Sequence, residues 1–283
     1  MKAWIVENTS GDYWGDDWNK IVFADNYMEA KKNHGNCRKG GHILELYNGD
    51  CLEIMKNIPD KSIDMILCDL PYGTTSNKWD SVIDLESLWG GYRRIIKDNG
   101  AIVLFAQTPF DKVLGNSNLK MLRYEWIWEK HIATGFLNAK KMPMKAHENI
   151  LVFYKKLPTY NPQFTEGKPY TGKSGRPSSN YGIHKDNFIT INNGYRYPRD
   201  VVKFKHDKEK LHPTQKPVKL LEYLIKTYTN ENMLVLDNCM GSGSTGIACL
   251  NTNRRFIGIE LDENYYNIAK QRIDNHIEQL NSM

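Results

Sequence analysis

The sequence contains no long apolar run, which argues against a membrane-spanning helix. None of its apolar stretches approaches the roughly 18 residues that such a helix requires. The chain begins MKAWIVENTSGDYWGDDW, in which acidic residues and glycine come too early for the apolar core of a secretory signal peptide. We therefore expect a cytoplasmic protein with no membrane partner.

Cysteine is also scarce, and its spacing matches no metal site. The cysteines are odd in number and form no Cys-x-x-Cys pair: Cys37, Cys51, Cys68, Cys239 and Cys249. The histidines nearest the motifs discussed below also lack the spacing of metal ligands: His131, His147 and His212. This pattern argues against a zinc site and a disulfide framework and favours a reducing compartment. We expect no bound metal.

Acidic residues are few in one segment, residues 131–219. That segment holds 17 Lys and Arg against 6 Asp and Glu, whereas the net charge of the whole chain is only +5. Six tyrosines lie in the same segment. A basic run is often only a solvated surface, but basic and aromatic side chains together are typical of surfaces that bind nucleic acid. The segment therefore predicts contact with a polyanion.

On either side of the loop-rich part of this segment, the chain has the pattern of an α/β protein. Apolar strands are predicted at 42–50, 62–69, 101–107, 150–155, 233–239 and 254–262. Amphipathic helices are predicted at 51–59, 84–100, 217–229 and 245–251, and a last one ends near residue 280. This alternation is typical of a doubly wound, largely parallel sheet.

Composition suggests four regions along the chain. Residues 1–40 form an aromatic-rich extension whose role we cannot assign, and residues 41–130 carry the first α/β part. Residues 131–210 are rich in Pro, Gly, Ser and Lys outside the predicted strand at 150–155, which is typical of an inserted, loop-rich module. Residues 211–283 resume the α/β pattern.

A glycine-rich motif lies in MLVLDNCMGSGSTGIACL, after a predicted strand and before a predicted helix. Gly241, Gly243 and Gly246 form a G-x-G-x-x-G pattern, and glycine lets the backbone turn sharply and approach a bound nucleotide. The next predicted strand carries Glu260 near its end, where a carboxylate can accept hydrogen bonds from ribose hydroxyls. These features predict an adenosine-containing ligand. They do not distinguish a dinucleotide from S-adenosylmethionine, and a tight turn without a ligand is the structural alternative.

A second motif, Asp69-Leu70-Pro71-Tyr72, follows the strand predicted at 62–69. At the carboxyl end of a parallel strand, side chains point into the crevice where such sheets bind ligands. Asp69 and the backbone carbonyl beside Pro71 can accept hydrogen bonds from an amino group, and Tyr72 offers a flat face for stacking. These groups suit a planar ring with an exocyclic amino group, such as adenine or cytosine. The alternative is a rigid turn, because Asp, Pro and Gly favour turns.

Taken together, the two motifs resemble the permuted β-class of DNA amino-methyltransferases, which methylate N6 of adenine or N4 of cytosine with S-adenosylmethionine. The Asp-x-Pro-Tyr element precedes the glycine loop as in that family, and HPTQKPVKLLEYLI (212–225) is similar to the family's lead-in to the cofactor site. The resemblance covers roughly residues 42–278. It implies a Rossmann-like sheet, S-adenosylmethionine as cofactor, and duplex DNA as partner and substrate.

The resemblance also implies a role for each motif residue. Asp69 and the carbonyl of Leu70, next to Pro71, would accept hydrogen bonds from the target amino group. Tyr72 would stack on a base turned out of the duplex. The implied cofactor residues are Asp50 near the adenine amino group, Lys216 near the methionine carboxylate, Glu260 at the ribose, and Asp237, Gly241, Ser242 and Gly243 around the methionine end.

The basic region 131–210 would recognise the DNA target. Lys and Arg contacts to phosphate would supply affinity, while a few side chains at base edges would supply specificity. The candidate DNA-binding residues are Lys140, Lys141, Lys145, Lys173, Arg176, Arg196 and Arg199. The sequence leaves open a homodimer and a cognate restriction nuclease as further partners.

Three positions depart from the family pattern. Leu70 stands where proline is common, but only its carbonyl is needed. Asn238 and Cys239 stand where proline and phenylalanine are common, which changes the expected shape of the cofactor pocket.

The resemblance leads us to expect direct methylation of adenine N6, because Asp69 at the first motif position favours adenine; cytosine N4 is the near alternative. Methylation of cytosine C5 would need a nucleophilic cysteine, and no cysteine here follows a proline as in that family. A nicotinamide-dependent dehydrogenase would explain the glycine loop alone. An inactive DNA-binding relative is a further alternative, and a protein-glutamine methyltransferase is expected to carry its glycine loop first.

Overall fold

The computed structural model describes residues 2–6, 20–24, 44–73, 82–173, 189–208 and 215–282. The predictions for Cys37, Arg176 and His212 and for the side chain of Lys173 lie outside the described part. The chain divides into two compact units, Pro162–Arg199 and the remainder, and the larger unit contains the central sheet.

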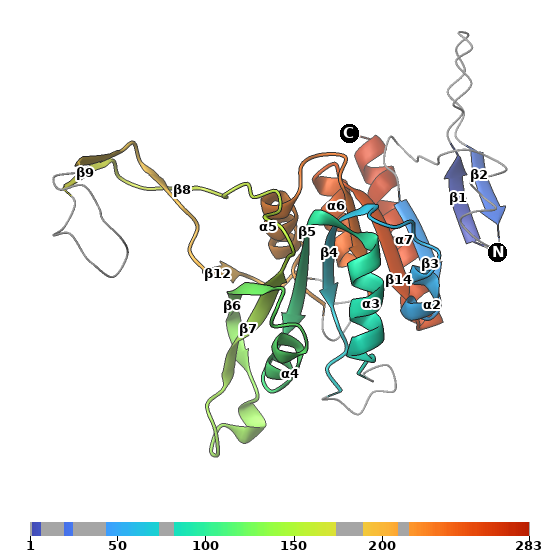
Figure 1. The fold of residues 1–283 in the computed structure, drawn as a ribbon, viewed down its shortest axis with the longest axis horizontal. Helices are drawn as coiled ribbons and strands as arrows, with labels where there is room; N and C mark the ends of the chain where they lie inside the picture. The colour runs from blue at the N-terminus through green and yellow to red at the C-terminus, as the bar shows by residue number, and fades with distance from the viewer. Residues whose placement is uncertain are drawn as a thin grey trace, which may run out of the picture. The chain divides into compact units, whose positions relative to one another are not determined.

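The central sheet of the larger unit has eight strands in the order β12-β6-β7-β5-β4-β13-β14-β3 (Figure 1). The strands are β3 (Leu44–Asn48), β4 (Ile63–Asp69), β5 (Ile96–Ala106), β6 (Leu122–Thr134), β7 (Lys145–Phe153), β12 (Val201–Phe204), β13 (Leu234–Asp237) and β14 (Arg255–Glu260). Every neighbouring pair is parallel except the two pairs made by β7. The predicted Rossmann-like, largely parallel sheet is therefore confirmed.

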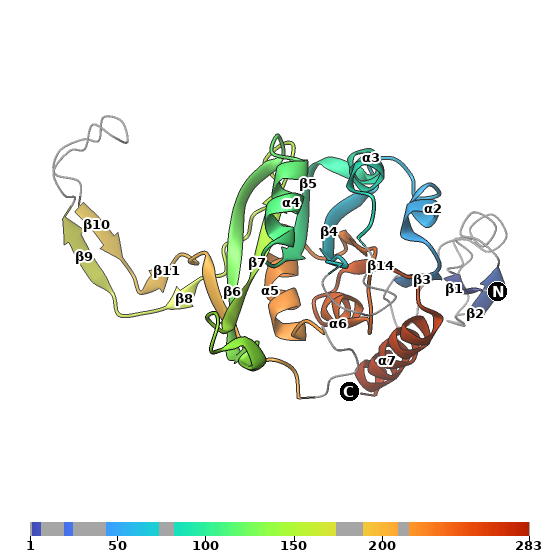
Figure 2. The ribbon, with the colours of Figure 1, turned by 90° about the horizontal axis from the view of Figure 1, so that it is seen from below.

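Helices cover both faces of this sheet (Figure 2). One face carries α2 (Cys51–Met55), α3 (Leu85–Ile95) and α4 (Phe110–Ser117), and the other carries α5 (Val218–Tyr228), α6 (Ser244–Asn251) and α7 (Glu263–Asn281). Alternate residues of β4 enter the two cores: Ile66 packs on the first face and Leu67 on the second. Because both faces are buried, the central strands read as continuous apolar runs.

Helix boundaries follow local capping and sheet pairing. Asp84 caps the start of α3 by accepting a hydrogen bond from the backbone N–H of Ser87 (2.8 Å). The helix predicted over 84–100 is too long, because α3 ends at Ile95. Ile96 has an extended backbone and pairs with Ile63 of β4, so the last residues of the predicted helix belong to β5.

Inside the segment 131–210 the structure has two different parts. Strands β7 and β12 belong to the central sheet. The smaller unit, Pro162–Arg199, holds two short antiparallel pairs, in which β8 (Thr165–Glu166) pairs with β11 (Tyr195–Arg196) and β9 (Tyr170–Lys173) pairs with β10 (Ile189–Asn192). Near the N-terminus, β1 (Lys2–Val6) pairs antiparallel with β2 (Lys20–Ala24). No helix in the described part of the chain is long and apolar enough to cross a bilayer.

Candidate active site

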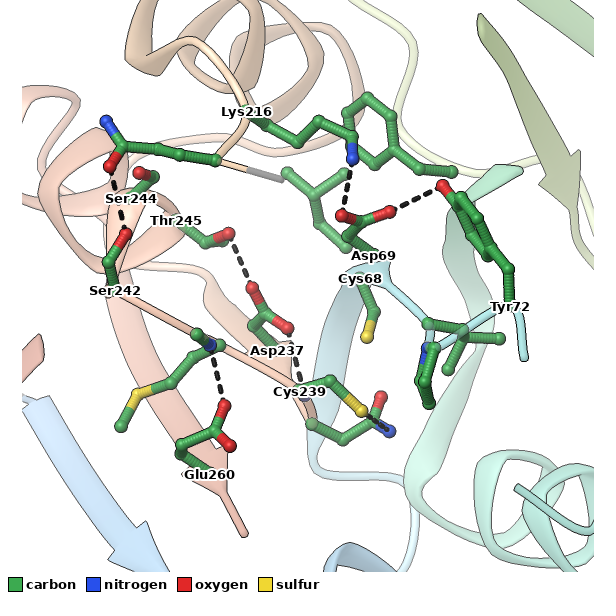
Figure 3. A pocket seen from close by; sticks show the side chains of 18 of the residues that line it. Cys68, Asp69, Tyr72, Lys216, Asp237, Cys239, Ser242, Ser244, Thr245 and Glu260 are labelled. Atoms are coloured by element: carbon green, nitrogen blue, oxygen red, sulfur yellow. Dashed lines mark hydrogen bonds and ion pairs between the residues drawn. The ribbon is translucent and has the colours of Figure 1, made fainter. Parts of the chain in front are cut away.

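Four acidic residues lie where parallel strands of the central sheet end. Asp69 and Asp237 are the last residues of β4 and β13, Glu260 is the last residue of β14, and Asp50 follows β3 by two residues. The carboxyl ends of parallel strands meet at one edge of a sheet. All four residues line one cavity of about 540 Å³, a size typical of small-molecule sites. Figure 3 shows three of them around this cavity.

The glycine loop folds back onto the acid at the end of β14. The backbone N–H of Gly241 donates to one oxygen of Glu260 (2.8 Å), and the N–H of Asp262 donates to the other (2.9 Å). Burial raises the pKa of Glu260, while these hydrogen bonds oppose the shift. Gly243 begins α6 with a left-handed φ of 78°, and a Cβ there would lie 3.0 Å from the Cβ of Ala269 in α7. Gly243 thus permits both the turn and the close helix packing.

Asp237 is buried at the floor of the cavity. It accepts hydrogen bonds from the Thr245 hydroxyl (2.6 Å) and from the backbone N–H of Cys239 (3.1 Å). Burial raises the pKa of the Asp237 carboxyl to about 7, although these hydrogen bonds oppose the shift. The group therefore titrates near neutral pH, and a cation bound beside it would favour its ionised form.

Two other predicted cofactor residues line the same cavity. Asp50 is exposed and caps α2, where it accepts a hydrogen bond from the N–H of Leu52 (2.7 Å). Ser242 is buried, and its hydroxyl donates to the side-chain oxygen of Gln215 (3.2 Å). The structure thus brings motif residues of both halves of the chain to one site, whereas Gly243 packs against α7 and is not among the residues that line the cavity.

The Asp69–Tyr72 corner is organised around the Asp69 carboxylate. The Tyr72 hydroxyl donates to Oδ1 (2.6 Å), and the Lys216 ammonium donates to Oδ2. The Tyr72 ring also packs on Phe110, with the ring centroids 5.2 Å apart. Burial raises the pKa of Asp69, while the positive charge of Lys216 opposes the shift. Leu70 is buried and Pro71 half-buried, and both line the cavity.

Lys216 lies within a buried chain of alternating charges. Besides Asp69, its ammonium lies 3.4 Å from Glu148, and Glu148 in turn pairs with Lys130 at 2.6 Å. Burial alone would raise the pKa of Glu148, but the two lysines outweigh it and hold this pKa below its ordinary value. Burial likewise opposes the charged form of Lys216, but Asp69 and Glu148 raise its pKa. The Lys216 ammonium, expected from the sequence to contact the cofactor, thus already pairs with two carboxylates of the protein.

Sequence reasoning missed Lys130 and Glu148. Both belong to the strands that extend the central sheet, β6 and β7, and both line the cavity. Glu148 stands two residues before the apolar run of β7, in HENILVF. The feature of the sequence that could have identified Glu148 is a charged residue close to an apolar run. Its buried partners come from distant parts of the chain, so the sequence alone does not reveal them.

The unusual Asn238 and Cys239 fit the interior of this site. Asn238 is buried, and its side-chain oxygen accepts a hydrogen bond from the Tyr92 hydroxyl (2.5 Å). The polar side chain at the position where proline was expected therefore has a hydrogen-bond partner from α3.

Burial raises the pKa of the nearby Cys68 thiol to about 12. Cys68 is therefore protonated at neutral pH and unsuited to act as a nucleophile.

The predicted DNA-binding residues that the structure describes belong to two different units. Lys140 and Lys141 lie on the connection between β6 and β7 of the larger unit, Lys145 is the first residue of β7, and all three are exposed. Arg196 and Arg199 belong to the smaller unit, where the Arg196 guanidinium lies 4.7 Å from the centre of the Tyr170 ring.

Among the residues that the structure describes, no three His, Cys, Asp or Glu side chains form a group that could hold a metal ion.

The buried charge chain predicts unequal effects of two matched substitutions. Glu148→Gln leaves Lys130 and Lys216 without their shared carboxylate, so we expect the free energy of unfolding to fall by about 3 kcal/mol. Glu129→Gln removes the partner of Lys203 from an exposed pair (2.9 Å) on the neighbouring strands and should change that free energy by less than about 1 kcal/mol. Denaturant titration of both variants measures the difference. Equal losses would contradict a special role for the buried chain.

The raised pKa of Asp237 predicts a pH-dependent stability. Between the ordinary pKa of 3.8 and the folded-state value of about 7, the folded protein binds more protons than the unfolded chain. The free energy of unfolding should therefore fall as pH rises through this range, by up to about 4 kcal/mol. Asp237→Asn should lack this contribution. Denaturant titrations from pH 4 to pH 8 test the difference, and parallel pH profiles for wild type and variant would exclude the raised pKa.

The residues of the cavity fit S-adenosylmethionine. Its ribose needs hydrogen-bond acceptors, and its ammonium and sulfonium groups favour nearby carboxylates. The cavity offers carboxyl groups at the ends of four strands and a glycine loop whose backbone closes one side.

Comparisons with known proteins identify the family to which the chain is similar. The model of the family N6_N4_Mtase, described as DNA methylase, matches residues 63–271. DNA adenine methyltransferase YhdJ of Escherichia coli (strain K12) is 30% identical, over 84% of this chain and 85% of its own length. Type II methyltransferase M.HpaI of Haemophilus parainfluenzae is 27% identical, over 83% of this chain and 75% of its own length.

Solved structures show the same likeness. The crystal structure of the M1.HpyAVI–SAM complex aligns with a TM-score of 0.56 at 28% identity, and the alignment covers 81% of this chain and 100% of that chain. The cytosine-N4-specific PvuII DNA methyltransferase shares the fold, with a TM-score of 0.60 at 15% identity over 86% of this chain and 95% of that one. The family match, the similar proteins and the cavity agree: this chain belongs to the N6/N4 DNA methylase family of S-adenosylmethionine-dependent DNA amino-methyltransferases.

Proposed function

We propose that this protein methylates the N6 amino group of adenine in duplex DNA after the adenine has been turned out of the helix. The observation that carries the proposal is the Asp69 carboxylate, which Tyr72 and Lys216 hold at the wall of the cavity. Aspartate at this motif position favours adenine, and the relative YhdJ bears the name of a DNA adenine methyltransferase. The amino group of cytosine at N4 is the alternative substrate, because the same contacts suit it.

The cofactor would lie along the edge formed by β13, β14 and β3. Glu260 would accept hydrogen bonds from the ribose, Asp50 would lie near the adenine amino group, and Asp237 would lie near the methionine end, beside the backbone of Gly241, Ser242 and Gly243. Bound S-adenosylmethionine supplies a methyl group on a positively charged sulfur. Asp237 would then be ionised by the nearby positive charge, although its pKa in the free protein is about 7.

Asp69 would act on the target amino group. Lys216 fixes one carboxylate oxygen, while the other oxygen binds the Tyr72 hydroxyl. In the proposed complex the amino group would donate to this second oxygen and to the backbone carbonyl of Leu70, and the Tyr72 ring would stack on the base. Both acceptors would concentrate the nitrogen lone pair toward the methyl group, so positioning and electrostatics would supply the main rate enhancement.

The proton balance assigns a second task to Asp69. In the proposed reaction the bond between the nitrogen and the methyl carbon would form as the carbon–sulfur bond breaks, and the electron pair of the broken bond would stay on sulfur. The nitrogen would then carry a positive charge and release one proton. The Asp69 carboxylate is the proposed first acceptor, and its raised pKa makes it a better base than an exposed aspartate.

Contacts to the DNA backbone are proposed for two groups of basic residues. Lys140 and Lys141, between β6 and β7, and Lys145, the first residue of β7, are exposed. Arg196 and Arg199 belong to the smaller unit. Phosphate contacts of this kind position a protein without reading sequence.

Transfer of labelled methyl from S-adenosylmethionine to duplex DNA, followed by separation of the nucleosides by mass spectrometry, tests the proposal. Wild type should place the label in N6-methyladenine, and Asp69→Asn should lower the rate at least about 100-fold, because it removes the charge that orients the amino group. Asp98→Asn, which changes a surface carboxylate paired with Lys155 (3.3 Å), should leave the rate unchanged.

Three outcomes would change or contradict this assignment. Label in N4-methylcytosine would keep the mechanism and change only the base. Full activity of Asp69→Asn would contradict the proposed role of Asp69, and no label in any DNA while the cofactor is demonstrably bound would contradict the proposed function.

A further inference from the structure

The connection between β6 and β7 projects past the edge of the sheet where the cavity lies (Figure 1). Asn149 of β7 pairs on one side with Ala106, the last residue of β5, and on the other with Ile127 of β6. Because β5 and β6 both run antiparallel to β7, β6 continues past the carboxyl edge through residues 128–134. At about 3.3 Å per residue, that extension spans roughly 23 Å.

The first strand of this hairpin forms part of the wall of the cavity. Lys130 and Thr134 of β6 both line it, together with Gln107 at the end of β5. Lys145, the first residue of β7, donates a hydrogen bond to Gln107 (3.3 Å). The hairpin therefore connects its tip, residues 135–144, with the site where the target base is proposed to react.

The tip has a defined backbone and presents apolar side chains to solvent, of which those of Phe136 and Leu137 are the most exposed. Gly135 turns the chain with a left-handed φ of 89°, and backbone hydrogen bonds from Asn138 to Gly135 (2.9 Å) and from Met142 to Asn138 (3.0 Å) close the turn. Phe136 is 78% exposed and Leu137 98% exposed. A single exposed leucine is ordinary in a soluble protein, but two adjacent large apolar residues at the end of an ordered hairpin suit a contact with a partner.

The charge around the tip indicates what kind of partner this is. Residues 130–147 contain no Asp or Glu, and the exposed Lys140, Lys141 and Lys145 follow the two apolar residues in the chain. An apolar pair beside cations matches a partner with anionic groups outside and an apolar interior. Duplex DNA, the substrate class of this family, has phosphates outside and stacked bases inside.

We propose that Phe136 and Leu137 enter the base stack of the DNA beside the target base and occupy the space that this base leaves. The inference rests on the proposed function, in which the base leaves the duplex. Unstacking a base step is unfavourable by a few kcal/mol, and inserted apolar side chains are a known physical means of offsetting it. Lys140 and Lys141 would contact phosphates on either side of the opened step.

The test compares two DNA substrates that carry a site methylated by wild type, found first by mapping methylated bases in DNA treated with the enzyme. In one duplex the target base is paired. In the other it lies opposite an abasic position, so that less pairing and stacking must be disrupted. The variant is the double substitution Phe136→Ala and Leu137→Ala. The matched control is Leu119→Ala with Leu157→Ala, which changes two exposed leucines (63% and 76%) next to the opposite end of the same strand pair.

The tip variant should lose at least about tenfold in kcat/KM on the paired duplex but less than about threefold on the abasic duplex. The control should match wild type on both. Fluorescence of 2-aminopurine at the target position should rise when wild type binds and should rise less with the tip variant. Because the abasic substrate reports the activity of each folded variant, a general loss of structure is distinguished from loss of base opening.

Several results would overturn the inference. Equal losses on both substrates would make the tip a plain surface contact, and full activity on both would mean that it does not touch DNA. Self-association that the tip variant abolishes, without discrimination between the substrates, would assign the tip to a second copy of the chain. No methyl transfer to DNA by wild type would overturn the proposed function as well. An active wild type with an equally active tip variant would overturn only the proposed role of Phe136 and Leu137.

Discussion

The ion pair between Lys216 and Asp69 is the contact on which the rest of the site depends. It joins residues 147 positions apart in the sequence and so connects the Asp-x-Pro-Tyr corner with the lead-in to the cofactor half. Glu148 and Lys130 continue it into a buried chain of alternating charges. Each charge is costly to bury alone, and each is offset by its neighbours. The position of the Asp69 carboxylate is thus determined by side chains from β4, β6, β7 and the segment before α5.

Much of the sheet could be predicted because its physical causes are local. Strands buried on both faces read as apolar runs, and the helices between them show the helical period. The boundary at Ile95 and Ile96 could not be predicted, because two adjacent isoleucines suit a helix end and a strand start equally. Pairing of Ile96 with the distant Ile63 decides it. The extension of the sheet by β6 and β12 depends on similarly distant pairings.

Some residues of the site could likewise be predicted from the sequence, whereas others are revealed only by the structure. Asp69, Asp237 and Glu260 meet at one cavity because each stands at the carboxyl end of a parallel strand, which the sequence pattern indicates. Glu148 lies within a strand and belongs to no motif, so only its burial between two lysines reveals its importance. The exposed pair at the hairpin tip is likewise identified by its fractional exposure and strand register.

The most direct test of the central ion pair is a double-mutant cycle on the free energy of unfolding. It uses Asp69→Asn, Lys216→Met and the double variant, and it needs neither cofactor nor DNA. Each single change removes one charge of the pair and leaves the other without its opposite charge at that position, whereas the double change removes both; Glu148 stays beside position 216 in every variant. A coupling of at least about 2 kcal/mol between the two positions is expected. Effects that add to within about 0.5 kcal/mol would contradict the account.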